Sequence, residues 1–397
     1  MYHATIIGAG IVGLATAHAI MNQQPDTKLA ILEKESDVAL HQTGHNSGVM
    51  HSGIYYQPGS LKARNCTLGY RKLIEFADAN NIKYDICGKV IVATDESQIP
   101  VLDTIIKKGR KNGLEGLKML SKSETHEKEP YVNAVQSIWV PQAGIIDYKE
   151  VAAKLRENLE KKGVEFFFSS KVTNIMEESA QVVINTVKGD FYSKKVIVCG
   201  GLYADKLAEK SGVDIVEAIV PFRGEYYELS EEKRYMVNNL IYPVPNPNFP
   251  FLGVHYTRLI HGGIEAGPNA VLAFKREGYS RWDVNLPELM ESLAYPGFRK
   301  LLGKYWRESI DELHRSFSKR AFVKALQHLI PDIGYDDLKR GKSGVRAQAL
   351  DRAGNMVDDF LIKRKGNVIN VINAPSPAAT SCLAIGEHIA GKAILPT

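Results

Sequence analysis

The chain has 397 residues, of which 44% are hydrophobic and 24% are charged. This is ordinary globular composition, and it excludes a low-complexity or largely disordered chain. The length predicts two domains, each able to bury its own core. The net charge of +5 comes without a dense Lys/Arg tract, so no nucleic-acid partner is expected, whereas small anionic substrates or an anionic membrane surface would suit it.

The four cysteines, Cys66, Cys87, Cys199 and Cys382, form no C-x-x-C pair. Neither a zinc ribbon nor a thioredoxin-like site is therefore indicated, and no metal site is expected. Reduced thiols fit a cytoplasmic compartment. No stretch reaches about 20 consecutive apolar residues, the length that crosses a bilayer, and the N-terminus leads into a structural strand rather than a signal peptide.

The N-terminal residues 3–33 have the pattern of a β-α-β unit. The apolar run Ala4–Ile7 predicts a buried strand, and a glycine-rich turn leads from it into a helix that reaches about Asn22. A second strand is expected over Lys28–Leu32. The following residues 34–60 are rich in Gly, Ser, His and Asn, which indicates a long ordered loop near a ligand.

The middle of the chain alternates between helical and strand patterns up to about Gly212, where this alternation ends. Helices are expected at 64–80, 95–112 and 147–162, and strands at 84–93, 130–141, 164–168, 181–187 and 195–198. Beyond Gly212 we expect antiparallel strands and turns at 226–229 and 242–250, a helical region at 287–329, a strand at 368–372, a loop at 373–380 and a helix to Ile394.

A Rossmann-like dinucleotide-binding domain, interrupted by a second domain, explains this order of elements. We therefore predict an α/β chain in which a discontinuous Rossmann-like βαβ domain carries an inserted, mixed-sheet α+β substrate domain. The dinucleotide-binding pieces are residues 1–80, 143–213 and 335–397, and the substrate-binding pieces are residues 81–142 and 214–334.

A dinucleotide fingerprint, Gly8-x-Gly10-x-x-Gly13, follows the first strand and opens the first helix. Gly8 permits the tight turn, Gly10 lets the backbone approach a pyrophosphate, and Gly13 lets helix and strand pack closely. Glu33 lies 20 residues after Gly13 at the end of the second strand, where a carboxylate accepts from ribose hydroxyls. The acid argues against NADP, whose extra phosphate it would repel.

The fingerprint alone does not separate FAD from NAD, and two later segments favour FAD. A strand that ends in the pair Gly200-Gly201 lets the backbone approach a ligand a second time. The strand, rigid loop and helix start through Asn373–Thr380 would aim a helix N-terminus at a flavin ring and stabilise the negative charge of its reduced form. A plain helix-start signal is the alternative interpretation of Pro375-Ser376-Pro377.

Several long motifs recur together in one family. They are the glycine fingerprint, Thr43-Gly-His45-Asn46-Ser47 and its continuation to Tyr56, Pro221–Tyr227, Phe249–Arg258, Gly267–Tyr279, Ser343–Gln348 and Asn373-Ala-Pro-Ser-Pro-Ala-Ala-Thr380. Together they resemble the L-2-hydroxyglutarate oxidase/dehydrogenase family, within the D-amino-acid-oxidase-like superfamily of FAD-dependent oxidoreductases. The resemblance spans the chain and is weakest at 97–135 and 281–330.

The resemblance implies non-covalently bound FAD and the oxidation of L-2-hydroxyglutarate to 2-oxoglutarate, with hydride transfer to flavin N5. It implies that the electrons pass to a quinone at the membrane or to oxygen. Cofactor contacts are expected from the residues Gly8, Gly10, Gly13, Glu33, Lys34, Thr43, His45, Asn46, Ser47, Val172, Gly200, Gly201, Pro377, Ala378, Ala379 and Thr380.

Oxidation of a 2-hydroxy acid needs a base for the hydroxyl proton and cations for the carboxylates. Histidine is the natural base, and His51 and His255 are equal candidates. The resemblance implies that Arg346 clamps the substrate carboxylate, as an arginine at a matching place does in relatives of this fold, and its planar fork matches carboxylate geometry. Arg223, Arg258 and Lys275 are the candidates for the second carboxylate of the substrate, and Tyr256 could add a hydroxyl donor.

Two rival functions remain open at this stage. A related flavoenzyme of the same fold could act on an amino acid or on glycerol 3-phosphate, and a non-catalytic flavin-binding sensor would need no base. The basic, aromatic stretch 299–307 could dock peripherally on anionic lipid at the inner face of the membrane, near a quinone, or could be a solvated helix face.

Overall fold

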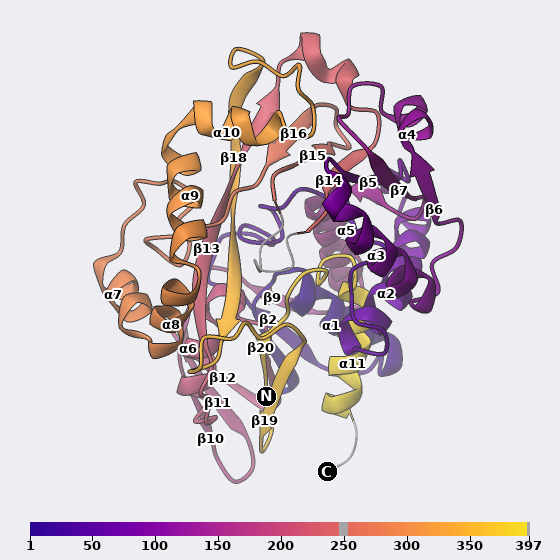
Figure 1. Cartoon of the computed structure of the whole chain (residues 1–397). Coiled ribbons are helices and arrows are strands. Elements are labelled where there is room, and N and C mark those ends of the chain that lie inside the picture. Colours follow the sequence, from indigo (N-terminus) through magenta and orange to yellow (C-terminus); the bar gives the residue numbers. More distant parts are fainter. Residues whose placement is uncertain (246–252, 395–397) are drawn as a thin grey trace.

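The computed structural model describes residues 1–245 and 253–394. Within these ranges, no helix combines the length and the apolar character that a membrane span requires. The described strands form a sheet of eight, a sheet of nine and a small sheet of three. Figure 1 shows strands of the eight-stranded sheet in the lower half of the molecule and strands of the nine-stranded sheet in the upper half.

The eight-stranded sheet is built around β1 (Tyr2–Ile7), which pairs in parallel with β2 (Leu29–Leu32) and with β12 (Gly189–Val198). β2, the last four residues of β1 and the last three residues of β12 are buried, which is why they appear in the sequence as short apolar runs. The other strands are β9 (Glu165–Phe167), β10 (Val172–Glu177), β11 (Val182–Thr186), β19 (Leu361–Lys365) and β20 (Val368–Asn373).

Helices cover both faces of this sheet. Four of them share one apolar cluster: α1 (Ile11–Gln23), α2 (Leu61–Ala79), α5 (Tyr148–Lys161) and α11 (Cys382–Ile394). On the opposite face, α6 (Ala204–Lys210) packs against β10 and β20. This is the layered arrangement of a doubly wound dinucleotide fold.

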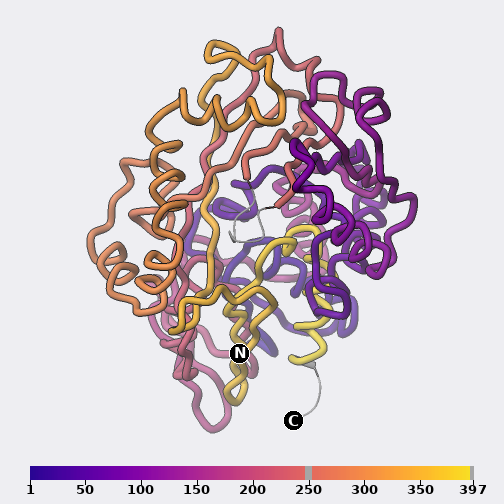
Figure 2. Tube along the Cα trace, viewed as in Figure 1, coloured from indigo at the N-terminus to yellow at the C-terminus, as the bar shows by residue number. Residues whose placement is uncertain are grey.

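The nine-stranded sheet is mixed. Its longest strands, β13 (Ala218–Leu229) and β18 (Leu338–Leu350), pair antiparallel along their lengths, and Figure 2 shows the gold trace of β18 descending toward the lower half, where both chain ends lie. The remaining strands are β5 (Lys89–Ala93), β6 (Lys118–Ser121), β7 (Gln136–Val140), β14 (Leu240–Pro243), β15 (His255–Arg258), β16 (Ile264–Gly267) and β17 (Val271–Leu272).

Helices pack against this sheet, and a small sheet adjoins it. The helices are α3 (Ile99–Lys111), α4 (Lys122–Lys128), α7 (Leu286–Ala294), α8 (Pro296–Lys304), α9 (Trp306–Phe317) and α10 (Lys319–Leu326). The small sheet joins β3 (Val49–Met50), β8 (Gly144–Ile146) and β4 (Tyr84–Asp85).

The predicted fold class is confirmed, but several predicted details are wrong. β18 belongs to the nine-stranded sheet, although the predicted boundary at residue 335 assigned it to the dinucleotide-binding piece, because it pairs with β13 rather than with β20. The single strand expected at 84–93 is two strands separated at Gly88, which has a positive φ of 77°. The helical region 287–329 is four helices, and β10 was not predicted.

Candidate active site

The glycine turn after β1 has no room for side chains. Gly8 has φ 104°, and a Cβ there would lie 2.4 Å from the Cys199 carbonyl oxygen, while a Cβ on Gly13 would lie 2.0 Å from the Gly8 oxygen. The first turn of α1 carries no acidic side chain. The open backbone and the positive end of a 13-residue helix therefore suit a pyrophosphate.

Glu33 braces the same turn. Its Oε2 accepts from the Ala9 N–H at 2.7 Å, and its Oε1 accepts from the Glu35 N–H at 3.0 Å. A carboxylate has about four acceptor positions, so ribose hydroxyls can still donate to it. Val172 packs beside Ile7 in a cluster at this sheet and adds an apolar wall. These residues fit the adenosine half of FAD.

The loop after β2 uses its predicted cofactor side chains mainly to hold its own shape. Thr43 Oγ1 accepts from the Ile11 N–H at 3.0 Å, which caps α1. The Asn46 side chain donates to the Thr43 carbonyl at 2.7 Å and accepts from the Gly48 N–H at 2.9 Å. His45 stacks on Tyr279 with ring centroids 4.0 Å apart. The Thr43 and Asn46 side chains are thus engaged within the loop itself.

A compact charged cluster follows Glu33. Glu35, His41 and Glu277 bring their ligand atoms within 4.8 Å of one another. The Lys34 ammonium lies among them, 2.5 Å from Glu35 and 2.8 Å from Glu277. Because Lys34 already supplies the positive charge, we assign no metal to this cluster. Its effect is to join the loop after β2 to the segment after β17.

The C-terminal segment meets the loop that carries His51. The Thr380 hydroxyl accepts from the His51 backbone N–H at 3.1 Å and also hydrogen-bonds the Tyr148 hydroxyl at 2.8 Å. Thr380 thus positions the His51 loop with the side chain that was predicted to touch the cofactor. Beside it, the buried hydroxyl of Ser52 has no described hydrogen-bond partner. An orphaned buried hydroxyl on the loop after β3 fits the polar edge of a flavin ring.

The rest of the predicted flavin cradle is also assembled. Gly201, three residues after the end of β12, has a positive φ of 53°, and Gly200 is packed against Leu207. Ala378 donates its N–H to the Pro375 carbonyl at 2.9 Å, which forms the turn before α11. Pro377 and Ala379 complete that turn, and Ala378 and Ala379 pack against the apolar cluster of the first sheet.

Above this cradle the structure gathers two histidines, two cations and a tyrosine. His255 stacks on Tyr242 with ring centroids 3.9 Å apart. The Lys89 ammonium lies over the same tyrosine ring, 4.6 Å from its centroid. The positive charge of Lys89 acts on both His51 and His255, and that of Arg346 acts on His255. We call these five residues the imidazole–cation cluster.

Both imidazoles in the cluster are neutral at physiological pH. Burial and the nearby charge of Lys89 lower the pKa of His51 to about 3. Burial and the charges of Arg346 and Lys89 lower the pKa of His255 to about 3. His255 Nδ1 lies 2.9 Å from the Gly253 carbonyl oxygen, which assigns its proton to Nδ1 and leaves Nε2 as an acceptor.

Unpaired polar atoms border the cluster. The Tyr55 hydroxyl and Glu265 Oε2 are buried and have no described hydrogen-bond partner. Thr257 shares a strand face with His255, and Glu265 is its partner across the β15–β16 ladder. Burial raises the pKa of Glu265 to about 7. Such a concentration of unsatisfied polar groups is typical of a binding site.

Three predicted substrate residues lie elsewhere, and these expectations are corrected. Tyr256 points to the opposite face of β15, and its hydroxyl donates to the Leu326 carbonyl at 3.3 Å within the apolar core. Arg258 shares that face and donates to the Asn238 carbonyl at 3.0 Å. Arg223 is buried and paired with Glu225 at 3.2 Å. These three side chains already make hydrogen bonds or an ion pair within the protein.

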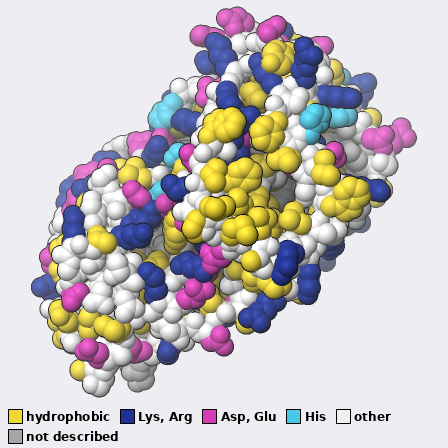
Figure 3. All heavy atoms as spheres, turned by 90° about the vertical axis from the view of Figure 1, so that its left-hand side faces the viewer, with side chains coloured by type: hydrophobic (Ala, Val, Ile, Leu, Met, Phe, Trp, Pro, Cys, Tyr) yellow, Lys and Arg dark blue, Asp and Glu magenta, His cyan; other side chains and the backbone are white. Residues whose placement is uncertain are grey.

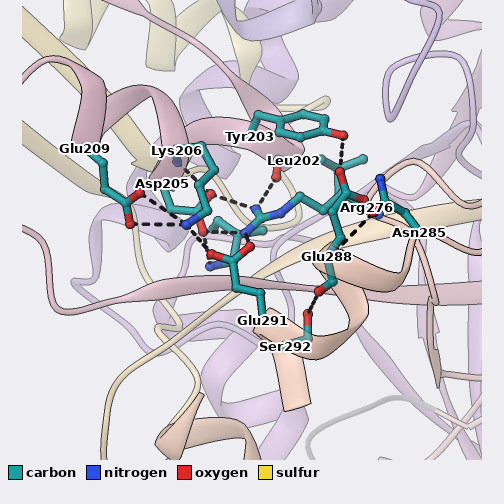
Figure 4. A network of polar contacts seen from close by, with 11 residues as sticks. Leu202, Tyr203, Asp205, Lys206, Glu209, Arg276, Asn285, Glu288, Glu291 and Ser292 are labelled. Atoms are coloured by element: carbon teal, nitrogen blue, oxygen red, sulfur yellow. Dashed lines mark hydrogen bonds and ion pairs between the residues drawn. The ribbon is translucent and has the colours of Figure 1, made fainter. Parts of the chain in front are cut away.

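The fourth, Lys275, is partly exposed, and the described residues give it no hydrogen bond or ion pair to the cluster. Its neighbour Arg276 is instead fully engaged. Figure 4 shows Arg276 reaching Asp205 of α6, which it holds through two bonds of 2.7 and 2.9 Å. A third bond of 2.7 Å runs to the Leu202 carbonyl. This network ties the segment after β17 to the first sheet.

Lys89 and Tyr242 are the site residues that sequence reasoning missed. Lys89 begins a strand whose other residues are all apolar and buried, and its own side chain is only 1% exposed. A charged residue within such a run was the available signal, since lysine is rarely fully buried without a partner. Nothing in the sequence alone marked Tyr242.

Comparisons with known proteins agree with this geometry. Residues 3–392 match the family model described as DAO, FAD dependent oxidoreductase. An L-2-hydroxyglutarate dehydrogenase of Indibacter alkaliphilus is 52% identical, with 98% of each chain covered. The human mitochondrial L-2-hydroxyglutarate dehydrogenase is 44% identical, covering 98% of this chain and 88% of that one. Among solved structures, the L-alpha-glycerophosphate oxidase of Mycoplasma pneumoniae has a TM-score of 0.82 at 23% identity, with 100% and 95% covered.

Proposed function

Because the chain belongs to the DAO family of FAD-dependent oxidoreductases, we propose that it oxidises L-2-hydroxyglutarate to 2-oxoglutarate. The observation that carries this proposal is the imidazole–cation cluster, in which two neutral histidines lie beside two positive charges. A dianionic hydroxy acid needs this combination of a proton acceptor and two cations. The names of the relatives that match nearly the whole chain support the same substrate.

When bound, FAD supplies the acceptor for a hydride from the substrate Cα. The protein's own part is to hold the carboxylates and to receive the hydroxyl proton. The Arg346 guanidinium can pair with the C1 carboxylate through two parallel hydrogen bonds. A neutral imidazole, His51 or His255, accepts the hydroxyl proton. For His255 the accepting atom is Nε2, since Nδ1 is bonded to Gly253.

The substrate assignment is tested by anaerobic mixing of the purified holoprotein with each enantiomer of 2-hydroxyglutarate, and with lactate, malate, glycerol 3-phosphate and amino acids. We expect L-2-hydroxyglutarate to bleach the flavin band near ~450 nm at the lowest concentration. Bleaching by an amino acid or by glycerol 3-phosphate, without bleaching by 2-hydroxyglutarate, would contradict the proposal.

Replacement of the base should slow flavin reduction strongly. We predict that His51→Ala or His255→Ala lowers the rate of anaerobic reduction by about 10²- to 10⁴-fold, the usual contribution of a general base. The variant with the smaller effect identifies the imidazole that only orients. His314→Ala, on the exposed surface of α9, is the matched control and should reduce at the wild-type rate. Wild-type rates in both variants would remove histidine as the base.

For the electron acceptor we propose a quinone at the membrane, with oxygen as the alternative. The supporting observation is an exposed apolar patch over α7 and α9, visible as the yellow area of Figure 3. It comprises Trp282, Val284, Leu286, Met290, Leu293, Trp306, Ile310, Leu313 and Phe317. Its basic neighbours are Arg299, Lys300, Lys304 and Arg307, of the stretch predicted from sequence.

The structure refines how that stretch would act. Helix α8 buries Phe298 and Leu301 against the sheet, so its apolar face is already covered. The exposed apolar side chains come from the flanking helices, and the basic side chains would meet anionic headgroups. We propose a cytoplasmic protein that touches the inner face of the membrane through this patch.

Vesicle sedimentation tests the contact. The wild-type protein should sediment with anionic vesicles more than with neutral ones, and Trp306→Glu with Ile310→Glu should abolish this. The matched control is Val187→Glu, which changes an exposed apolar residue between β11 and β12 of the eight-stranded sheet. Equal sedimentation of the patch variant and the wild type would contradict the membrane contact. Reoxidation of the reduced protein by a soluble quinone and by oxygen then ranks the acceptors.

A further inference from the structure

Lys89 is a buried cation that the described fold leaves without an anionic partner. Its side chain is 1% exposed, and its described contacts are the rings of Tyr55 at 5.1 Å and Tyr242 at 4.6 Å. Among the described residues, no carboxylate, carbonyl or hydroxyl accepts a hydrogen bond from its ammonium. Buried charges in proteins are paired or bind a ligand.

The position of Lys89 is next to the reacting groups. It shares the Tyr242 ring with His255, which stacks on that ring. Its charge lowers the pKa of both His51 and His255, after the larger effect of burial. The Tyr55 hydroxyl, on the other ring beside Lys89, is buried without a described hydrogen-bond partner.

We propose that Lys89 and the Tyr55 hydroxyl form the binding subsite for the second carboxylate of the substrate, the one remote from the hydroxyl. This inference rests on the proposed function and deepens it. Arg346 then takes the carboxylate beside the hydroxyl, and Lys89 takes the remote one, so each negative charge meets one cation. The two aromatic rings hold the ammonium in place without neutralising it, which leaves its charge free for the ligand.

The subsite makes Lys89 the residue that selects diacids over monoacids. A substrate with a methyl group in place of the remote carboxylate would leave the ammonium desolvated and unpaired. A 2-hydroxy monoacid of the same length, such as L-2-hydroxypentanoate, should therefore be a poor substrate for the wild type. This monoacid gains no interaction with the Lys89 charge, so removal of that charge should not lower its kcat/KM.

The test compares two substrates in Lys89→Met, which keeps the length and loses the charge. We expect kcat/KM for L-2-hydroxyglutarate to fall by about 30- to 1,000-fold, the usual effect of removing one partner of a buried charge pair. The value for L-2-hydroxypentanoate should stay level or rise. Lys118→Met, on the exposed edge strand β6 of the same sheet, is the matched control. An equal loss for both acids, or an unchanged preference for the diacid, would overturn the proposal.

A binding measurement keeps the test independent of turnover. Glutarate carries both carboxylates and no hydroxyl, so its affinity for the oxidised holoprotein can be followed by the shift of the flavin spectrum. Burial lowers the pKa of Lys89 to about 8. Glutarate binding to the wild type should therefore weaken as the pH rises through 8, and Lys89→Met should bind weakly without this pH dependence. A pH-independent affinity in the wild type would contradict the subsite.

The two proposals fail in different ways. If neither 2-hydroxy acid reduces the wild-type flavin, the proposed function is wrong, and the glutarate titration still tests the subsite. If L-2-hydroxyglutarate reduces the flavin and Lys89→Met keeps its diacid preference, only the subsite is wrong. Flavin content and thermal melting of each variant confirm that it is folded.

Discussion

Arg276 and Lys89 are both buried cations, but the protein treats them differently. Arg276 is paired through both arms with Asp205 and donates to the Leu202 carbonyl as well. Burial opposes its charge, yet Asp205 together with Glu291 and Glu288 outweighs burial, and the pKa of Arg276 is raised. Lys89 has aromatic rings in place of a carboxylate, and burial lowers its pKa to about 8.

The magnitudes indicate which cation is structural. Contact with an aromatic ring contributes about 0.5–2 kcal/mol, whereas removing an ammonium from water costs several kcal/mol even after relaxation. The rings therefore do not compensate for burial of Lys89, while the bidentate carboxylate does so for Arg276. A cation whose burial is compensated holds the fold, and one whose burial is not compensated is available to a ligand. The following variants test this difference.

The largest effect on stability is expected from Arg276→Met. It leaves Asp205 buried without its counter-ion, which lowers the free energy of unfolding by about 3–5 kcal/mol. Chemical denaturation of the holoprotein measures this. The double variant Asp205→Leu with Arg276→Met removes both charges and should recover part of the loss. A single variant as stable as the wild type would show that the pair is not structural.

Lys89→Met should behave in the opposite way and leave stability unchanged or slightly higher. The direction in which the free energy of unfolding changes with pH tests this expectation. The folded pKa of about 8 lies below the ordinary value of 10.5, so between these pH values the unfolded chain binds more protons at this residue. Stability of the wild type relative to Lys89→Met should therefore rise as the pH increases from 8 to 10. A relative stability that falls over this window would contradict an unpaired ammonium.

The smallest effect is expected from Lys206→Met at the rim of the Arg276 network. Lys206 pairs with Glu291 and Glu209, but its side chain is 31% exposed. Solvent screening limits such pairs to about 0–1 kcal/mol. Chemical denaturation of this variant and of Arg276→Met compares their losses in the free energy of unfolding. The comparison shows whether burial, rather than the number of ion pairs, determines how much a cation stabilises the fold. Losses of equal size would contradict this interpretation.

The parts of the fold that sequence predicted are those whose signals are local. Gly8, Gly13 and Glu33 follow from the spacing of one strand, turn and helix, and the structure gives each the expected role in that turn. The membership of β18 was wrong because strand pairing between residues more than a hundred positions apart leaves no local pattern.

The candidate site was predicted in part. His51, His255 and Arg346 lie together, but their roles stay predictions. On β15, alternate residues face opposite sides of the sheet, so Tyr256 points away from the face that carries His255. Sequence could not say which face is the site. Lys89 was missed because its strand is otherwise apolar and predicts only a buried core.

The structure of the holoprotein with 2-oxoglutarate tests the central claim most directly. We expect one carboxylate to lie within hydrogen-bond distance, about 2.7–3.2 Å, of the Lys89 ammonium, and the other to pair with Arg346. The keto oxygen should then face His51 or His255. A ligand whose remote carboxylate contacts neither Lys89 nor Tyr55 would contradict the account.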